Sequence, residues 1–312
     1  MTRDQAPGKH QLTRQSVHPV IVVPTHRENP TPEESISLRQ LARVMGDREI
    51  VILSPRHLDL GRTMELLPKA GQVRVDPGWM DSHGAYNRMI ISPLLCHIFA
   101  GYSHLLLHEP DSIVLSDQLD HWCLQPYDYI GAPWFTPRAS GEGAELIPGG
   151  NSGFSLFRLA AMKRVTSSWR RWYPLRYTLG DFRSCLRGNP DGLRKGLLGL
   201  YPGGLLKGAH RLYSSFCDQY WSLLVPSIDK RFRVAPSDVA VRFSWEKWSF
   251  LCMEICRGHL PFGLHAWAKY DFDFLLPHFI AAGVDLTGMP PWTPPPWRAD
   301  WTPPIWPVGQ VR

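Results

Sequence analysis

The chain has 312 residues, of which 44% are hydrophobic and 20% charged, with a formal net charge of +6. This is a globular composition, large enough for one large domain or two small ones. No run of eighteen apolar residues is present, which argues against a transmembrane helix. Residues 1–16 are polar, so we expect a disordered lead-in and not a secretory signal. The six scattered cysteines form no Cys-x-x-Cys pair, which favours a reduced, cytoplasmic protein.

Strands and helices are predicted to alternate over the first third of the chain. The strands are expected at residues 17–24, 50–53, 73–75 and 103–108, and the helices at 31–46, 62–67 and 85–99. The first helix opens on a capping box, Thr31-Pro32-Glu33-Glu34, and Ser92-Pro93 is expected to bend or split the third. This alternation predicts an α/β fold with a parallel sheet and helices on both faces.

The remaining pattern is mixed. Short strands are predicted at residues 113–115, 129–132 and 153–157, and helical segments at 117–123, 159–171, 219–225 and 277–282. A Gly-rich stretch at 137–150 is predicted to be a mobile loop, and residues 180–210 an inserted or mobile segment. From Pro290 onward the chain holds eight prolines and four tryptophans, so residues 289–312 are expected to be an irregular tail.

Basic residues cluster at 164–176 and 183–207, with tryptophan and tyrosine among the first group. Such clusters favour phosphate-bearing substrates or peripheral contact with an anionic membrane face, although a solvated basic surface is an equally good interpretation. The sequence holds no helix-turn-helix, zinc-finger or RNA-binding signature, so no nucleic-acid partner is expected.

The most informative stretch is Leu105 to Leu115, where an apolar run ends at Glu109 and Asp111. Such a run predicts a buried strand, and ligands of open α/β sheets bind at strand ends of this kind. Two neighbouring carboxylates repel each other unless a cation lies between them, and oxygen ligands suit Mg2+ or Mn2+. The pattern predicts an enzyme that holds a nucleotide diphosphate through a metal, although many strands end in a solvated aspartate.

Five motifs in order carry a resemblance to a known family. They are Tyr86-Asn87-Arg88-Met89-Ile90-Ile91-Ser92-Pro93, the acidic pair, Tyr127-Asp128-Tyr129-Ile130-Gly131-Ala132-Pro133-Trp134, Gly150-Asn151-Ser152-Gly153-Phe154-Ser155-Leu156 and Pro261-Phe262-Gly263-Leu264-His265-Ala266-Trp267. Over about residues 20–271 the chain resembles the bacterial DUF5672 domain family, a GT-A-like glycosyltransferase group found with polysaccharide genes. The resemblance implies a single GT-A-like domain over residues 17–288, with a mixed, mostly parallel sheet flanked by helices.

The resemblance also implies a metal site. Asp111 matches the acidic residue of the family after the central strand, whereas Glu109 stands where the family usually has glutamine. His265 matches the late histidine that GT-A enzymes often supply as a further ligand, although a lone histidine is more often structural. The expected cofactor is therefore Mn2+ or Mg2+, held by Glu109, Asp111 and His265. Strand alternation places His108 opposite both acids, so it is predicted to be a strand-end side chain and not a ligand.

Asp218 is the predicted catalytic base. It lies where similar families carry a Glu-Asp pair at the start of a helix, and there it would take a proton from the acceptor hydroxyl in an inverting reaction. Cys217 replaces the expected glutamate, and an aspartate that caps the helix is the competing interpretation.

Donor-binding residues are predicted around the first strand and the acidic pair. In GT-A folds the loop after the first strand takes the nucleotide, so Thr25 and Arg27 are expected to bind it together with Asp111. Arg88, on the helix before the central strand, is expected to contact a phosphate or to pair with Asp111. Tyr86 and Asn87 are weaker candidates.

The acceptor or the sugar is predicted to contact Trp134, Asn151 and Gly153. Trp134 can stack on a sugar face, Asn151 offers both donor and acceptor groups, and Gly153 permits close backbone approach. A core tryptophan and a plain glycine turn are the competing interpretations.

The predicted function is a metal-dependent glycosyltransferase that moves a sugar from a nucleotide-sugar to a glycan or lipid-linked acceptor. One alternative is a nucleotidyltransferase or another metal-dependent phosphate enzyme, which would need further carboxylates such as Asp117 and Asp128. The other is a carbohydrate-binding protein that keeps the fold without turnover. The absence of a Walker loop and of a Gly-x-Gly-x-x-Gly fingerprint argues against a P-loop NTPase and a dinucleotide dehydrogenase.

Overall fold

The computed structural model describes residues 17–136, 143–168 and 216–294, together with the short pieces 182–183, 186–188 and 193. The predicted lead-in at 1–16, most of the predicted insertion at 180–210 and most of the predicted tail lie outside the described residues.

The main sheet has six strands in the order β3-β2-β1-β4-β7-β6. Its strands are β1 (Pro19–Pro24), β2 (Ile50–Pro55), β3 (Gly71–Val75), β4 (His104–His108), β6 (Tyr129–Phe135) and β7 (Leu146–Arg158). Strands β1 to β4 pair in parallel, and β7 runs antiparallel to its neighbours β4 and β6. The predicted α/β fold with a mixed, mostly parallel sheet is therefore confirmed.

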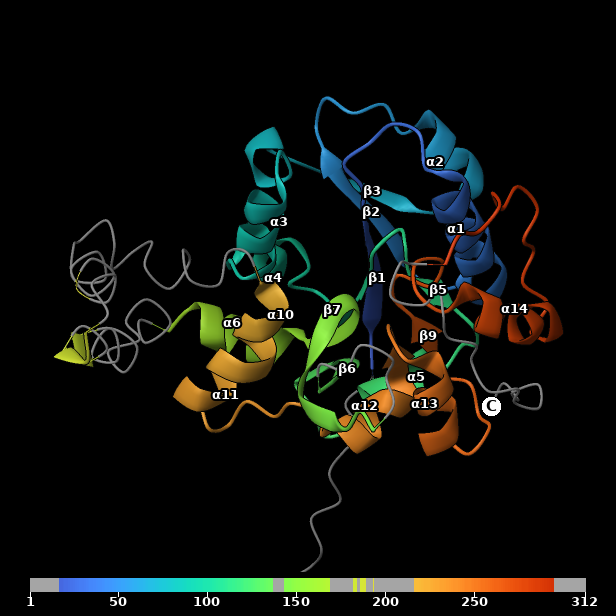
Figure 1. Ribbon diagram of the computed structural model, residues 1–312. Coiled ribbons are helices and arrows are strands. Elements are labelled where there is room, and N and C mark those ends of the chain that lie inside the picture. Colours follow the sequence, from blue (N-terminus) through green and yellow to red (C-terminus); the bar gives the residue numbers. More distant parts are fainter. Residues whose placement is uncertain are drawn as a thin grey trace, which may run out of the picture.

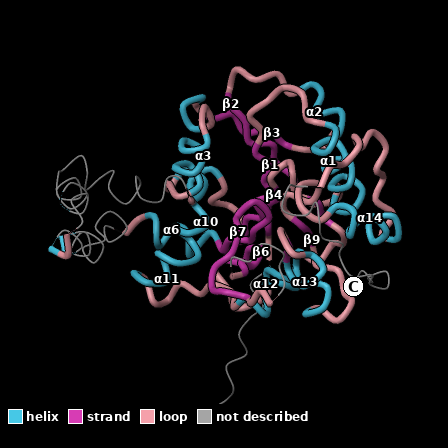
Figure 2. The backbone as a smooth tube through the Cα atoms, in the orientation of Figure 1, coloured by secondary structure: helices cyan, strands magenta, loops and turns pink. Residues whose placement is uncertain are grey.

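Helices cover both faces of this sheet (Figure 1). On one side lie α1 (Pro32–Met45), α2 (Gly61–Leu66), α5 (Leu119–Cys123) and α12 (Ser237–Phe243). On the other lie α3 (His83–Ile90), α4 (Leu94–Ile98), α6 (Leu159–Thr166), α10 (Cys217–Gln219), the π-helix Tyr220–Leu224 and α11 (Val225–Ile228). Figure 2 shows the strands between these two groups.

Strand alternation explains the two cores. On β1, Val20 and Val22 join the cluster under α3 and α4, whereas Ile21 and Val23 join the cluster under α1. Because successive side chains of a strand point to opposite faces, a fully apolar strand is expected only where both faces are covered. The capping box predicted for α1 is present, with Glu34 N donating to Thr31 Oγ1.

A second, smaller sheet carries the order β5-β9-β8. Its strands, β5 (Ile113–Val114), β9 (Gly263–Leu264) and β8 (Ser244–Trp245), have two residues each. They pack with α13 (Ser249–Ile255) and α14 (Phe272–Ala281) around a third apolar cluster that includes Trp245, Trp267 and Phe279. The start of the predicted tail lies on this part, because Trp292 Nε1 donates to the carbonyl of Ala268.

The sequence prediction needs two corrections in its second half. The Gly-rich stretch is not all loop, because β7 begins at Leu146 and pairs Gly150 with Pro133 of β6. Gly149 permits this pairing for two reasons. Its φ of 115° is a conformation that glycine adopts easily, and a side chain there would overlap Trp134. The last helix starts at Phe272 and not at residue 277. Within the described ranges, no helix combines the length and the apolarity needed to span a membrane.

Candidate metal centre and the cavity beside it

The acidic pair occupies a tight turn at the carboxyl end of β4. The amide of Glu109 donates to the carbonyl of Gly153 on β7 (2.8 Å), and the amide of Ser112 closes the turn on the carbonyl of Glu109 (2.8 Å). The Ser112 hydroxyl donates to the same Gly153 carbonyl (2.9 Å). This turn fixes Glu109 and Asp111 at the edge where open α/β sheets bind ligands.

The small sheet brings His265 to the acidic turn. Strand β5 follows the turn directly and pairs antiparallel with β9, with Ile113 opposite Leu264. The antiparallel register continues beyond the strands, since the amide of Trp267 donates to the carbonyl of Asp111 (3.4 Å). His265 therefore reaches the acids through backbone pairing, although it lies about 150 residues further along the chain.

The three side chains converge on one point. His265 Nε2 lies 3.5 Å from Glu109 Oε2 and 3.4 Å from Asp111 Oδ1. One ligand atom from each residue lies within 4.8 Å of the other two, which is a spacing that one ion can bridge. Half of the Asp111 side chain is exposed (50%), whereas His265 is largely covered (13%). Two carboxylates and one imidazole fit a divalent ion such as Mn2+ or Mg2+, with positions left for a ligand.

The charges of the group are strongly coupled. Burial opposes protonation of His265, but the carboxylates of Asp111, Glu109 and Glu246 outweigh it and raise the pKa of the imidazole well above its usual range. Burial also opposes ionisation of Asp111, and His265 outweighs it and lowers the pKa of that carboxyl. Without a metal, the imidazolium thus balances the acidic turn, as a bound cation would.

Glu246 is a site residue that the sequence reasoning missed. Its Oε1 lies 3.7 Å from His265 Nδ1, and its side chain is 15% exposed. Strand β8 pairs in parallel with β9, with Trp245 beside Leu264, so the next residues Glu246 and His265 lie side by side. A carboxylate behind a ligating histidine orients the ring and strengthens it as a ligand. The one sequence signal for Glu246 was its position directly after a short apolar strand. This signal could not be used, because a strand of two residues is too short to predict from sequence.

Gly153 makes room for the imidazole. A Cβ at this position would overlap Cδ2 and Nε2 of His265, and the Gly153 carbonyl holds the acidic turn. The predicted role of Gly153 in sugar binding stays a prediction, whereas the close approach in the structure is made by His265.

The substitution Gly153→Ala is expected to weaken Mn2+ binding by roughly 10- to 100-fold, because the imidazole must leave its position. Isothermal titration with Mn2+ measures this. Gly101→Ala is the matched control, since nothing lies within 4 Å of a Cβ placed there. Equal affinities of the two variants would contradict the steric role.

A cavity of about 510 Å3 opens beside the acidic turn. Glu109 and Asp111 line it, together with Arg27 after β1 and Tyr86 on α3. The Tyr86 hydroxyl donates to Glu109 Oε1 (2.8 Å), and burial and the Glu109 charge raise the pKa of the phenol well above its usual range. Tyr86 therefore stays neutral and positions Glu109. Arg27 pairs with Glu34 (3.7 Å), and its side chain is 43% exposed.

Asp218 lies close enough to the metal centre to be affected by its charge. Burial raises the pKa of its carboxyl, and the like charges of Glu246 and Glu109 add to the effect. Helix α10 is held by Asn87, whose Oδ1 accepts from the amide of Cys217 (2.9 Å). Cys217 itself is buried, with Sγ 3.2 Å from the Ser152 hydroxyl. The Asp218 carboxylate accepts from the amide of the next residue, Gln219 (2.7 Å), but Asp218 lies inside α10, whose N-cap is Phe216, so the competing interpretation of a capping aspartate is wrong.

Two of the predicted donor-binding residues do not reach the cavity. Thr25 is buried, and its hydroxyl donates to the carbonyl of Arg27 (3.2 Å). This hydrogen bond stabilises the loop that carries Arg27. Arg88 is exposed on α3, and no ion pair joins it to Asp111 in the described part of the chain.

The predicted acceptor residues lie on β6 and β7, outside the lining of this cavity. Trp134 packs over Gly149, and the Asn151 Oδ1 accepts from the amide of Gly153 (2.7 Å). His108 is not part of the Glu109–Asp111–His265 group: it is fully buried beside Phe154, and burial lowers its pKa to about 4.

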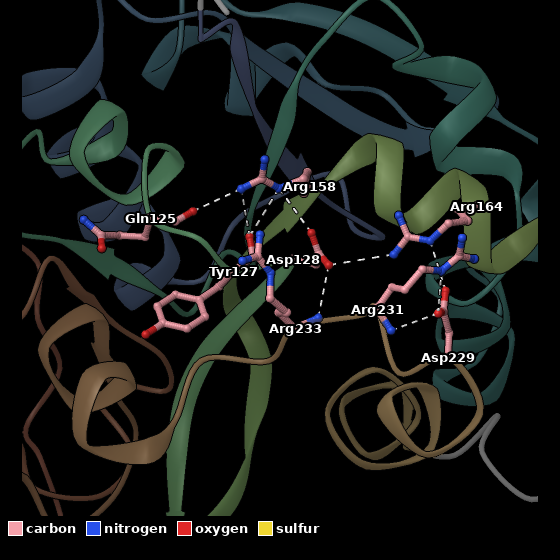
Figure 3. A network of polar contacts seen from close by, with 8 residues as sticks. All are labelled: Gln125, Tyr127, Asp128, Arg158, Arg164, Asp229, Arg231 and Arg233. Atoms are coloured by element: carbon pink, nitrogen blue, oxygen red, sulfur yellow. Dashed lines mark hydrogen bonds and ion pairs between the residues drawn. The ribbon is translucent and has the colours of Figure 1, made fainter. Parts of the chain in front are cut away.

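The two further carboxylates considered for a phosphate enzyme, Asp117 and Asp128, form ion pairs with arginines. Asp117 pairs with Arg48 (2.8 Å). Asp128 pairs with Arg158 (3.2 Å) and Arg164 (3.8 Å), as Figure 3 shows. Within the described ranges, the Glu109–Asp111–His265 group is the one cluster of at least three such residues with this spacing, and neither of these two aspartates belongs to it. Asp117 and Asp128 therefore do not supply the further carboxylates near the metal centre that a phosphate enzyme would need.

The ion pairs of Asp229 predict a contribution to stability that depends on pH (Figure 3). Burial would raise the pKa of Asp229, but Arg164 (3.0 Å) and Arg231 (3.1 Å) outweigh it and lower the pKa to about 2. A lowered pKa means that the contribution is complete above about pH 4 and is lost as the pH falls towards 2. Since Arg231 is exposed, we expect only about 1 kcal/mol.

Thermal unfolding of the wild type and of Asp229→Asn between about pH 6 and pH 3 measures this contribution. The variant is expected to be less stable at pH 6, and the difference should shrink towards pH 3. A difference independent of pH would contradict the assignment to these ion pairs.

The fold and the site together define an α/β domain with a candidate metal centre, of two carboxylates and one histidine, at the carboxyl edge of a mostly parallel sheet. The chain belongs to the DUF5672 family, whose model is described as a protein of unknown function and matches residues 69–265, more than half of the sequence. A comparison with curated proteins gives no match.

Several solved glycosyltransferase structures resemble the chain at low identity. The galactosyltransferase LgtC, in complex with donor and acceptor sugar analogues, is 10% identical with a TM-score of 0.43, over 79% of this chain and 86% of that chain. Mouse xyloside xylosyltransferase 1 is 11% identical with a TM-score of 0.41, over 80% and 97%. Core-mannan synthase A from Aspergillus fumigatus, in its Mn/GDP form, is 11% identical with a TM-score of 0.35, over 50% and 62%. Scores this low carry no functional argument, so the function is argued from the site of this chain.

Proposed function

We propose that the protein is a glycosyltransferase that moves a sugar from a nucleotide-sugar to a glycan or lipid-linked acceptor with the help of Mn2+ or Mg2+. The observation that carries the proposal is the convergence of Glu109, Asp111 and His265 next to a cavity of about 510 Å3. A volume of this size accommodates a small-molecule ligand. A metal bound by the three residues would stabilise the negative charge that develops on the leaving diphosphate.

The side chains around the cavity have distinct roles in this proposal. Tyr86 holds Glu109 by a hydrogen bond, and the Glu246 carboxylate, 3.7 Å from His265 Nδ1, attracts the imidazole, so the donor meets a group whose charges are already arranged. Arg27 lines the same cavity and offers a guanidinium to the nucleotide. Thr25 stabilises the loop after β1 that carries Arg27.

Asp218 is the base in this proposal. Its raised pKa makes its carboxylate a stronger proton acceptor than an ordinary aspartate. It takes the proton of the acceptor hydroxyl as that oxygen attacks the anomeric carbon, and direct attack inverts the configuration. Asn151 on β7 and Trp134 on β6 contact the acceptor.

We place the reaction at the cytoplasmic face of a membrane, where lipid-linked acceptors are found. The net charge of +6 favours peripheral contact with anionic lipids.

A thermal-shift panel of nucleoside diphosphates and nucleotide-sugars, each with and without Mn2+, tests the proposal. A ligand that binds only the folded state raises the melting temperature, and one nucleotide class is expected to do so only with metal. A shift with nucleoside triphosphates followed by their hydrolysis would favour the phosphate enzyme. Sugar binding without any dependence on metal would favour the carbohydrate-binding protein.

A further inference from the structure

A second cavity, of about 630 Å3, opens between α5, the end of α12 and the segment that follows α13. Figure 1 shows α5, α12 and α13 together, away from α3. The two cavities share no lining residue. The metal centre and its donor cavity therefore do not account for the second cavity.

The lining of the second cavity is basic. Among the described residues, Arg242, Arg257, His121 and His259 contribute to it, and no aspartate or glutamate does. In the part of the chain that the structure describes, neither arginine forms an ion pair within 4.0 Å, in contrast to Arg158. Uncompensated guanidinium groups around one concave surface attract an anion, and their planar forks match a phosphate or a carboxylate.

Two further observations point to a ligand. Trp122 is 4% exposed, and its indole nitrogen has no hydrogen-bond partner among the described residues; the buried Nδ1 of His259 has none there either. Both residues line the cavity, and buried polar atoms of folded proteins nearly always have a partner. The φ of 53° at Arg257 is explained by the end of α13, where the amides of Arg257 and Gly258 cap the carbonyls of Glu254 and Met253 (both 2.9 Å).

We propose that this cavity binds a compact ligand with a phosphate or carboxylate group, namely a phosphorylated or carboxylated sugar. The anionic group lies between Arg242 and Arg257, and the body of the ligand lies along Trp122, Leu260 and the partly exposed Ile255. The anionic group follows from the lining itself. The choice of a sugar as the body rests on the proposed glycosyltransferase function.

Isothermal titration at low ionic strength and without metal tests the proposal with three probes: glucose 6-phosphate, glucuronate and glucose. At least one anionic probe is expected to bind, and neutral glucose is not. The probe that binds identifies the group as phosphate or carboxylate. Binding of glucose as tight as that of both anions, or no binding of either anion, would overturn the proposal.

Variants locate the binding. Arg242→Gln and Arg257→Asn are each expected to weaken it about tenfold, because each removes one charged hydrogen-bond donor. Asparagine tolerates the left-handed conformation at residue 257. Arg62→Gln, on the exposed surface of α2, is the charge-matched control and is expected to leave the affinity unchanged. Equal affinities in all three variants would place the anion elsewhere and overturn the proposal.

The two proposals fail separately. Asp111→Asn is expected to keep the anion affinity, and Arg242→Gln is expected to keep metal-dependent nucleotide binding. If nucleotides fail to bind while glucose 6-phosphate or glucuronate binds at the arginines, the glycosyltransferase proposal is lost and the anion site stands. Loss of anion binding in Asp111→Asn would instead assign the anion to the metal centre.

Discussion

Asp111→Asn is expected to abolish metal-dependent nucleotide binding and to leave the fold intact. The substitution removes one of the two acidic ligands, 3.4 Å from His265 Nε2, and an amide is a much poorer ligand for a divalent cation than a carboxylate. The side chain is 50% exposed, and His265 keeps Glu109 (3.5 Å) and Glu246 (3.7 Å) as partners, so loss of this ion pair should lower the free energy of unfolding by only about 1 kcal/mol and leave the fold intact. The Mn2+-dependent part of the nucleotide thermal shift measures the loss.

Asp117→Asn is the matched control. It makes the same chemical change in an aspartate that pairs with Arg48 away from the metal centre. The control should retain the metal-dependent shift. If Asp111→Asn keeps the same shift as the wild type, the metal centre does not hold the nucleotide and the central proposal is lost.

Asp218→Asn is expected to lower kcat by roughly 100- to 10,000-fold, with little change in nucleotide affinity, because it removes the base but none of the metal ligands. The pH dependence carries a further signature. Burial and the charge of Glu246 raise the pKa of Asp218, and the base is active only when it is ionised. The rate should therefore fall on the acidic side at a higher pH than an ordinary aspartate would give.

Asp238→Asn, an exposed aspartate in the first turn of α12, is the control for this variant and should keep the wild-type kcat. The configuration of the product at the anomeric carbon tests the same proposal by NMR. Retention of configuration, or an unchanged kcat in Asp218→Asn, would rule out direct attack assisted by this base.

Local sequence signals predicted the elements that build the first half of the molecule. The capping box places α1, Ser92-Pro93 separates α3 from α4, and the apolar run of β4 ends at the acidic turn. These signals work because each acts within a few residues of the chain. The position of Glu109 and Asp111 at the carboxyl edge of the sheet follows from them directly.

The rest of the site depends on pairings that no local signal encodes. His265 was predicted only through the resemblance, and Glu246 was missed, because both follow strands of two residues in the second sheet. The role of Gly153 beside His265 could not be read either, since the two meet across about 110 residues of sequence. A glycine that makes room for a distant side chain looks, in sequence, like any glycine turn.

The antiparallel pairing of β5 with β9 makes the metal centre a late product of chain synthesis. Glu109 and Asp111 leave the ribosome with the first half of the sheet, but their third partner arrives only with residue 265. Until then, the acidic turn of the nascent chain has the hydrogen bond from Tyr86 to Glu109 but lacks the imidazolium of His265. In the proposed metal site, a divalent ion therefore gains its third ligand only after the C-terminal sheet has docked.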